Sequence, residues 1–199
     1  MERKELRDIV ISAVVLAVAF GVALSDGIFG FTGFNTLATA IIVALFTISI
    51  AFILHELAHR YVARRYGSYA IYKLWPMGLL LALVTSMFGI VFAAPGAVMI
   101  YPKADIWGNA TELTKKKIGL ISLAGPLVNI ILASVFLGLN FFYPYFVFSM
   151  AGAINAWLAL FNTLPLFILD GLKIFSWDKR IWAGTFLISI GLVLASGLF

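Results

Sequence analysis

Long apolar runs separated by short polar segments make up most of this chain. Six such runs occupy residues 9–24, 34–54, 74–94, 118–142, 145–169 and 181–199. An α-helix rises about 1.5 Å per residue, so about 20 apolar residues cross the roughly 30 Å hydrocarbon core of a bilayer. Most of the runs are long enough to do so, and the pattern predicts a polytopic membrane protein.

The positions of the basic residues predict which runs cross the membrane. All fourteen Lys and Arg residues fall in four segments that border apolar runs: 3–7, 60–73, 103–117 and 173–180. Lys and Arg concentrate in cytoplasmic loops, whereas the loops 25–35 and 140–145 contain neither. We therefore expect the N-terminus inside, five crossings, and these two loops on the outer side.

The run 74–94 does not fit this scheme, because basic segments border it on both sides. Glycine and proline recur in and beside it, at Pro76, Gly78, Gly89, Pro95 and Gly96. We expect a small membrane-associated strand or re-entrant element there, which is tolerated where protein shields its backbone. The alternative is an ordinary span with inverted topology downstream.

The composition agrees with an all-α membrane protein. Hydrophobic residues make up 63% of the 199 residues and charged residues only 12%, unlike a soluble protein. We predict one domain, residues 1–199, forming a polytopic bundle of about five or six transmembrane helices. The net charge of +5 comes from basic residues that border the apolar runs, so it reflects membrane topology and does not indicate nucleic-acid binding. Residues 1–25 resemble a signal peptide, but their apolar core is long, so we expect an uncleaved first helix.

The second apolar run continues into the sequence HELAH, residues 55–59. On a helix, residues i and i+4 share a face, so His55 and His59 can bind one metal ion together. Glu56 can then act as general base toward a metal-bound water, as this pattern does in zinc hydrolases. Counted back from Arg64, His59 lies about 7 Å and His55 about 13 Å into the membrane from the cytoplasmic side.

Other interpretations of HELAH remain open. The histidines could form interhelical hydrogen bonds while Glu56 pairs with Arg60. Two observations favour a metal: the chain has only these two histidines, and ionisable groups within a membrane segment usually mark function. Because the chain has no cysteine, the ligands must be nitrogen and oxygen atoms.

A catalytic zinc ion takes three protein ligands, so the two histidines need a partner. Asp170 lies at the cytoplasmic end of the run 145–169. Pro165 removes a helical hydrogen bond and Gly171 permits a turn, so we expect a broken helix end that directs Asp170 inward. Its alternative role is an interfacial pair with Lys173. The competing acids lie in polar or basic segments, where a solvated carboxylate is expected: Asp8, Asp26, Asp105, Glu112 and Asp178.

Three motifs follow one another along the chain. They are HELAH at 55–59, AGP at 124–126 near the start of a later run, and Asn-x-x-Pro followed by Asp-Gly at 162–171. In this order they resemble the site-2 protease family of intramembrane zinc metalloproteases. The resemblance covers about residues 54–172.

The resemblance implies roles for particular residues. His55, His59 and Asp170 would bind one zinc ion per chain, Glu56 would activate water, and Asn162 would help to hold the substrate or its oxyanion. Residues 74–101 would correspond to membrane-associated strands that offer an edge to an unwound substrate segment.

Four further polar or small residues are left outside the catalytic set. Gly125 and Pro126 are sufficiently explained as a helix start and a close-packing device. Asn129 and Asn155 are expected to form hydrogen bonds between helices.

The sequence therefore predicts a zinc-dependent intramembrane endopeptidase. It would hydrolyse peptide bonds in or near the transmembrane segments of membrane-protein substrates. We expect it in the lipid bilayer of the cell membrane, with its active site toward the cytoplasmic side. Two alternatives remain: a metal transporter or sensor, and another membrane zincin with a glutamate as third ligand.

Overall fold

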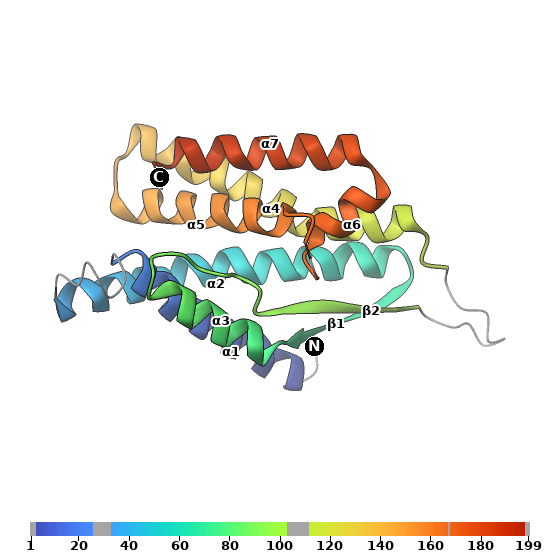
Figure 1. Cartoon of the computed structure of the whole chain (residues 1–199), viewed down its shortest axis with the longest axis horizontal. Helices are drawn as coiled ribbons and strands as arrows, with labels where there is room; N and C mark the ends of the chain where they lie inside the picture. The colour runs from blue at the N-terminus through green and yellow to red at the C-terminus, as the bar shows by residue number, and fades with distance from the viewer. Residues whose placement is uncertain (1–2, 26–32, 103–111, 167, 198–199) are drawn as a thin grey trace.

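The computed structural model describes residues 3–25, 33–102, 112–166 and 168–197. The elements in these residues are, in order, α1 (Arg3–Ala23), α2 (Phe34–Arg65), β1 (Ser68–Leu74), α3 (Pro76–Ser86), β2 (Gly96–Pro102), α4 (Lys115–Phe142), α5 (Phe146–Thr163), α6 (Asp170–Trp177) and α7 (Lys179–Ala195). In Figure 1, α2 lies between two groups: α4, α5 and α7 on one side, and α1, α3 and the two strands on the other.

Four of the described helices, α1, α2, α4 and α5, are long and apolar enough to cross a membrane. This supports a membrane protein, as the sequence predicted. Helix α7 has 17 residues and a length of about 25 Å, which falls short of a typical hydrocarbon core. The predicted number of five or six spans is therefore not confirmed.

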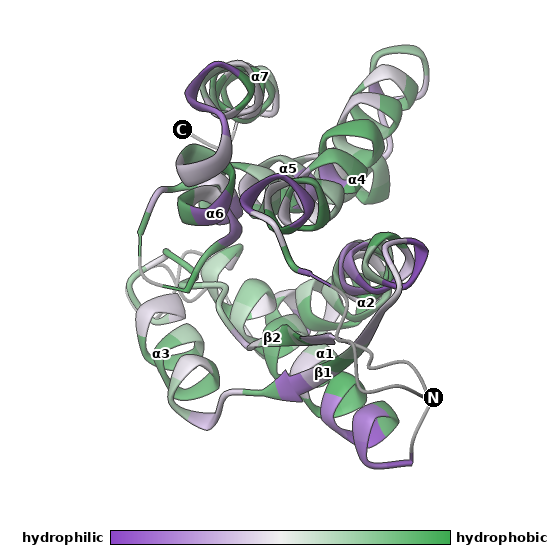
Figure 2. Cartoon of the chain, turned by 90° about the vertical axis from the view of Figure 1, so that its right-hand side faces the viewer, coloured by the Kyte–Doolittle hydropathy of each residue, from purple (hydrophilic) through white to green (hydrophobic). Residues whose placement is uncertain are grey.

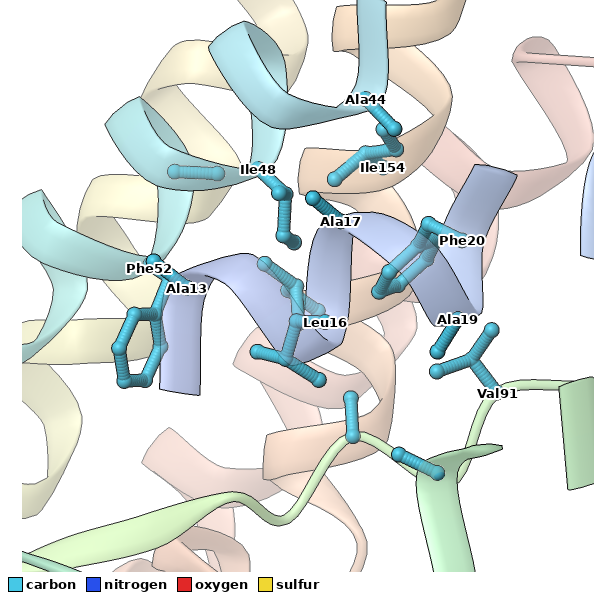
Figure 3. Packing of buried hydrophobic residues seen from close by; sticks show 14 of the residues in the cluster. Ala13, Leu16, Ala17, Ala19, Phe20, Ala44, Ile48, Phe52, Val91 and Ile154 are labelled. Carbon is cyan, nitrogen blue, oxygen red and sulfur yellow. The ribbon is translucent and has the colours of Figure 1, made fainter. Parts of the chain in front are cut away.

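Small residues allow α1 to lie close against α2. Figure 3 shows Ala17 of α1 near Ile48 of α2, and Ala13 of α1 near Phe52 of α2, and all four are buried. A Cβ added at Gly21 would lie 2.5 Å from a side-chain carbon of Ile41. Such close approach supplies the van der Waals packing that holds helices together in lipid.

Two strands with a helix between them connect α2 to α4. Strand β1 pairs antiparallel with β2, from Ser68↔Pro102 to Leu74↔Gly96. Helix α3 fills much of the run 74–94 but has only 11 residues, about 16 Å, too short to cross the membrane. The run is thus not a long span, as expected, and the small two-stranded sheet is present, but its strands flank the short helix on either side. Pro76 in the first turn of α3 favours a helix start, because its φ is already helical.

The apolar run 145–169 is interrupted, as predicted from Pro165. Helix α5 ends at Thr163, and α6 begins at Asp170. Asp170 therefore opens a new helix, and its expected position at the end of the preceding one is wrong. Gly171 does not make the turn either. Its role is close approach, because a Cβ there would lie 2.1 Å from the Thr163 carbonyl oxygen.

Helix α4 starts well before the AGP motif. Its N-cap is Thr114, whose side chain accepts a hydrogen bond from the backbone N–H of Lys117. Pro126 lies inside the helix, so the interpretation of Gly125 and Pro126 as a helix start is wrong.

Candidate metal centre

Three side chains from two separate helices converge between α2 and the start of α6. The Nε2 atoms of His55 and His59 lie 3.0 Å apart. The Oδ2 atom of Asp170 is 2.9 Å from His59 Nε2 and 3.4 Å from His55 Nε2. Ligands arranged tetrahedrally around zinc at about 2.0–2.1 Å are about 3.3 Å from one another. The predicted ligand group is therefore assembled with spacing that suits zinc.

The outer ring nitrogens of both histidines are already engaged. His59 Nδ1 donates to the backbone carbonyl of Ile121 at 2.7 Å, and His55 Nδ1 donates to Asn129 Oδ1. A carbonyl oxygen can only accept, so His59 carries its proton on Nδ1. In the neutral rings, both Nε2 lone pairs then point at the Asp170 carboxylate. Three electron-pair donors that face one another can bind a cation between them, which is the pattern of a metal site.

Asp170 is held in position by its local chain and by Lys173. The Lys173 Nζ atom lies 3.4 Å from Asp170 Oδ1, which leaves Oδ2 directed at the histidines. The Lys173 ammonium also stabilises the ionised form of this carboxyl. An ionised Asp170 can therefore serve as an anionic ligand. The expected Lys173 pair exists alongside this role and does not replace it.

Gly125 of α4 forms the wall of this centre. A Cβ there would lie 2.4 Å from His59 Nε2 and 2.5 Å from His55 Nε2. Only a residue without a side chain leaves the donor atoms accessible. From the sequence, Gly125 was interpreted as part of a helix start and as a close-packing residue, and its place beside the histidine nitrogens was not predicted. The AGP motif was the signal, since its order after HELAH associated it with the same site.

Glu56 and Asn162 line the pocket that contains the three ligands. Glu56 is buried, and its Oε2 atom has no hydrogen-bond partner among the described residues. The Asn162 side chain donates to the Leu158 carbonyl at 3.0 Å through Nδ2. The space open to water is about 40 Å³, which holds water but not a peptide. A carboxylate without a partner beside a metal site is placed to exchange protons with such a water.

The proposed pairing of Glu56 with Arg60 does not occur. Arg60 instead lies 3.1 Å from Glu5 of α1, whose Oε1 atom also accepts the backbone N–H of Tyr72 at 3.3 Å. Glu5 is 3% exposed and was not identified from the sequence, because it lies in the basic N-terminal segment. This ion pair connects α1 to the turn of α2 that follows His59.

Those competing acids that the structure describes lie outside the candidate metal centre. Asp8 is buried beside Arg7, so its expected solvation is wrong. Asp178 caps α7 by accepting from the N–H groups of Arg180 and Ile181. Glu112 is exposed. The predictions for Asp26 and Asp105 fall outside the described residues.

Comparison with known proteins found two relatives with related names. “Putative zinc metalloprotease MJ0611” of Methanocaldococcus jannaschii is 38% identical over 198 residues, covering 96% of this chain and 94% of the relative. “Putative zinc metalloprotease YwhC” of Bacillus subtilis is 32% identical over 153 residues, covering 64% of this chain and 65% of the relative. No family model and no solved structure matches the chain.

Zinc is the metal that both relatives' names specify. The two imidazoles and one carboxylate assembled here are ligands that zinc accepts. These findings agree on a zinc cofactor, and they support a hydrolase. With 38% identity along nearly its whole length, the chain belongs to the zinc metalloprotease family that the archaeal relative represents.

Proposed function

We propose that this protein is an intramembrane endopeptidase of the site-2 protease type, which cleaves peptide bonds in or near transmembrane segments. One observation carries the proposal. The buried Glu56 carboxylate, with an oxygen that has no partner among the described residues, shares a pocket with His55, His59 and Asp170. The helix that carries three of these four residues is long and apolar enough to cross a membrane.

His55, His59 and Asp170 would hold the zinc ion, which when bound supplies Lewis acidity and makes water a nucleophile near neutral pH. Glu56 accepts the proton of the attacking water and returns it to the leaving amine. Asn162, which lines the same pocket, donates through Nδ2 to its own helix. This bond uses one hydrogen of the NH₂ group, so the second hydrogen and the Oδ1 atom could contact a substrate.

The substrate would approach along the chain segment that precedes and includes β2. Residues 93–98 line the pocket, and β2 pairs with β1 in a sheet of two described strands. A peptide added to β2 as a further strand would pair its backbone while crossing the pocket. This arrangement suits a substrate helix that has unwound, because helical amides are otherwise engaged in internal hydrogen bonds.

The active site would face the cytoplasm. The end of α2 and the starts of α4 and α7 lie at the same end of the molecule in Figure 1, and each carries basic residues. Figure 2 views this end and shows hydrophilic segments gathered there. Lys and Arg at one end of a helical bundle favour the cytoplasmic side of a cell membrane.

The proposal is tested with purified protein in liposomes, incubated with a set of labelled single-span membrane proteins and followed by mass spectrometry of the fragments. Glu56→Gln should keep zinc and lose cleavage, because it retains all three ligands. A zinc transporter would instead keep zinc flux into the liposomes in this variant, and that result would refute the hydrolase. A substrate series in which leucine replaces helix-weakening residues should be cleaved more slowly; equal rates would contradict the unwinding step.

A further inference from the structure

A chain of buried amide groups connects the metal centre to α5. Asn155 of α5 accepts a hydrogen bond from Asn129 of α4 at 3.0 Å. Asn129 Oδ1 in turn accepts from His55 Nδ1 of α2. Asn129 is 0% and Asn155 1% exposed, so water does not compete with these bonds.

Backbone carbonyls at two points determine the direction of this chain. Asn155 Nδ2 donates to the Ala151 carbonyl at 2.9 Å, so the Oδ1 atom of Asn155 must face Asn129. Asn129 Nδ2 donates both to that oxygen and to the Ala51 carbonyl, at 3.3 Å. Its own Oδ1 must therefore face His55. Because only an NH₂ group can donate to a carbonyl, neither amide can be reversed without losing bonds.

We propose that Asn155 is a positioning residue for the zinc ion, acting through Asn129 to keep the proton of His55 on Nδ1 and its Nε2 lone pair toward the metal. The proposal rests on the zinc site of the proposed function, but not on peptidase activity. A metal-binding histidine commonly relies on a partner at its second nitrogen, and loss of such a partner lowers metal affinity about 10–100-fold.

The second histidine provides an internal reference. His59 Nδ1 donates to the carbonyl of Ile121, a backbone group that cannot rotate as an amide side chain can. Removal of Asn155 should leave this bond intact. The Nδ2 group of Asn129 would keep only its long bond to Ala51, so the amide could reverse and present NH₂ to His55. The proton of His55 would then move to Nε2, where it blocks a metal ligand.

The test uses the fact that the chain has only two histidines. Protein labelled with ¹⁵N-histidine, and purified through a tag without histidine, gives ring signals for His55 and His59 alone. Spectra of the metal-free protein in detergent at one neutral pH report which nitrogen carries the proton. Zinc affinity is measured on the same samples by competition with a chelating dye.

Three substitutions of Asn155 are compared with a matched control. Asn155→Ala and Asn155→Leu both remove the acceptor, and the larger side chain separates this effect from that of a cavity. Asn155→Asp should rescue, because a buried, protonated carboxyl can donate to Ala151 and accept from Asn129. The control is Ser189→Ala on α7, a buried hydroxyl that donates to the Thr185 carbonyl of its own helix.

In the parent protein both rings should carry the proton on Nδ1. Asn155→Ala and Asn155→Leu should shift His55, but not His59, toward the Nε2–H form and weaken zinc binding about tenfold or more. Unchanged His55 signals in both variants would overturn the proposal, even if zinc binding weakened, since Asn155 would then act only through packing. Because the metal-free ring signals require no substrate, absence of peptidase activity would refute the proposed function without affecting this result.

Discussion

Gly125→Ala should abolish zinc binding while leaving the helix that carries it intact. The new Cβ would lie 2.4 and 2.5 Å from the two histidine Nε2 atoms, whereas an ordinary contact begins at about 3.4 Å. The rings must retreat by about 1 Å, several times the roughly 0.2 Å tolerance of a metal–ligand distance. We expect zinc affinity to fall at least about 100-fold, equivalent to about 2.7 kcal/mol.

Helix propensity alone would not predict a harmful effect of Gly125→Ala. Replacing glycine by alanine within a helix stabilises it by about 0.5–1 kcal/mol when the added methyl group meets nothing. Gly138 lies on the same helix, and a Cβ there has no neighbour within 4 Å. Gly138→Ala is therefore the matched control, and its zinc affinity should equal that of the parent.

Both variants are purified in detergent, and zinc is measured by mass spectrometry and by competition with a chelating dye. Circular dichroism verifies that helix content is unchanged. Parent-like zinc affinity in Gly125→Ala would refute the reasoning, because the metal could not then lie at the two Nε2 atoms that Gly125 contacts.

Further predictions concern the ligands, the ion pair near them and acid. Asp170→Ala should lose zinc with little change in helix content, as measured by mass spectrometry and circular dichroism; full zinc content would exclude Asp170 as a ligand. Glu5→Leu leaves the largely buried Arg60 without its partner and should lower the free energy of unfolding by up to about 3–5 kcal/mol. Replacing the exposed Glu112 by glutamine should change it by at most about 0.5 kcal/mol; equal midpoints of thermal unfolding in detergent would contradict this difference. Zinc affinity should fall as the pH is lowered, because protons compete with the metal for its ligands; dye competition between pH 8 and 5.5 measures it, and a flat profile would exclude histidine ligation.

Some features of the molecule were accessible from local sequence. His55 and His59 are four residues apart on a helix, and helix geometry places them on one face whatever packs around the helix. Pro165 interrupts the apolar run wherever that run packs, because it lacks an N–H group. Asp170 could be predicted as the third ligand from local sequence too, because it follows this interruption and lies at the edge of an apolar run.

Other predictions failed where the outcome depended on neighbours. The run 74–94 contains residues that suit a strand, a turn or a helix, and α3 forms because Pro76 begins it and Gly78 permits contact with Ala94. Composition did not determine the number of membrane spans either, because the ends of each helix depend on its caps and on the segments that pack against it.

The sequence by itself determined the apolar helices, the pair of histidines and the chemistry of the ligands, because helical periodicity and side-chain type are local properties. Only the tertiary structure decided that Gly125 faces the donor atoms, that Asn129 and Asn155 orient His55, and that Arg60 pairs with Glu5. Each of these contacts joins residues that are 26 to 74 positions apart in the chain. Such contacts are specified by the packing of whole helices, which no pattern within a short segment records.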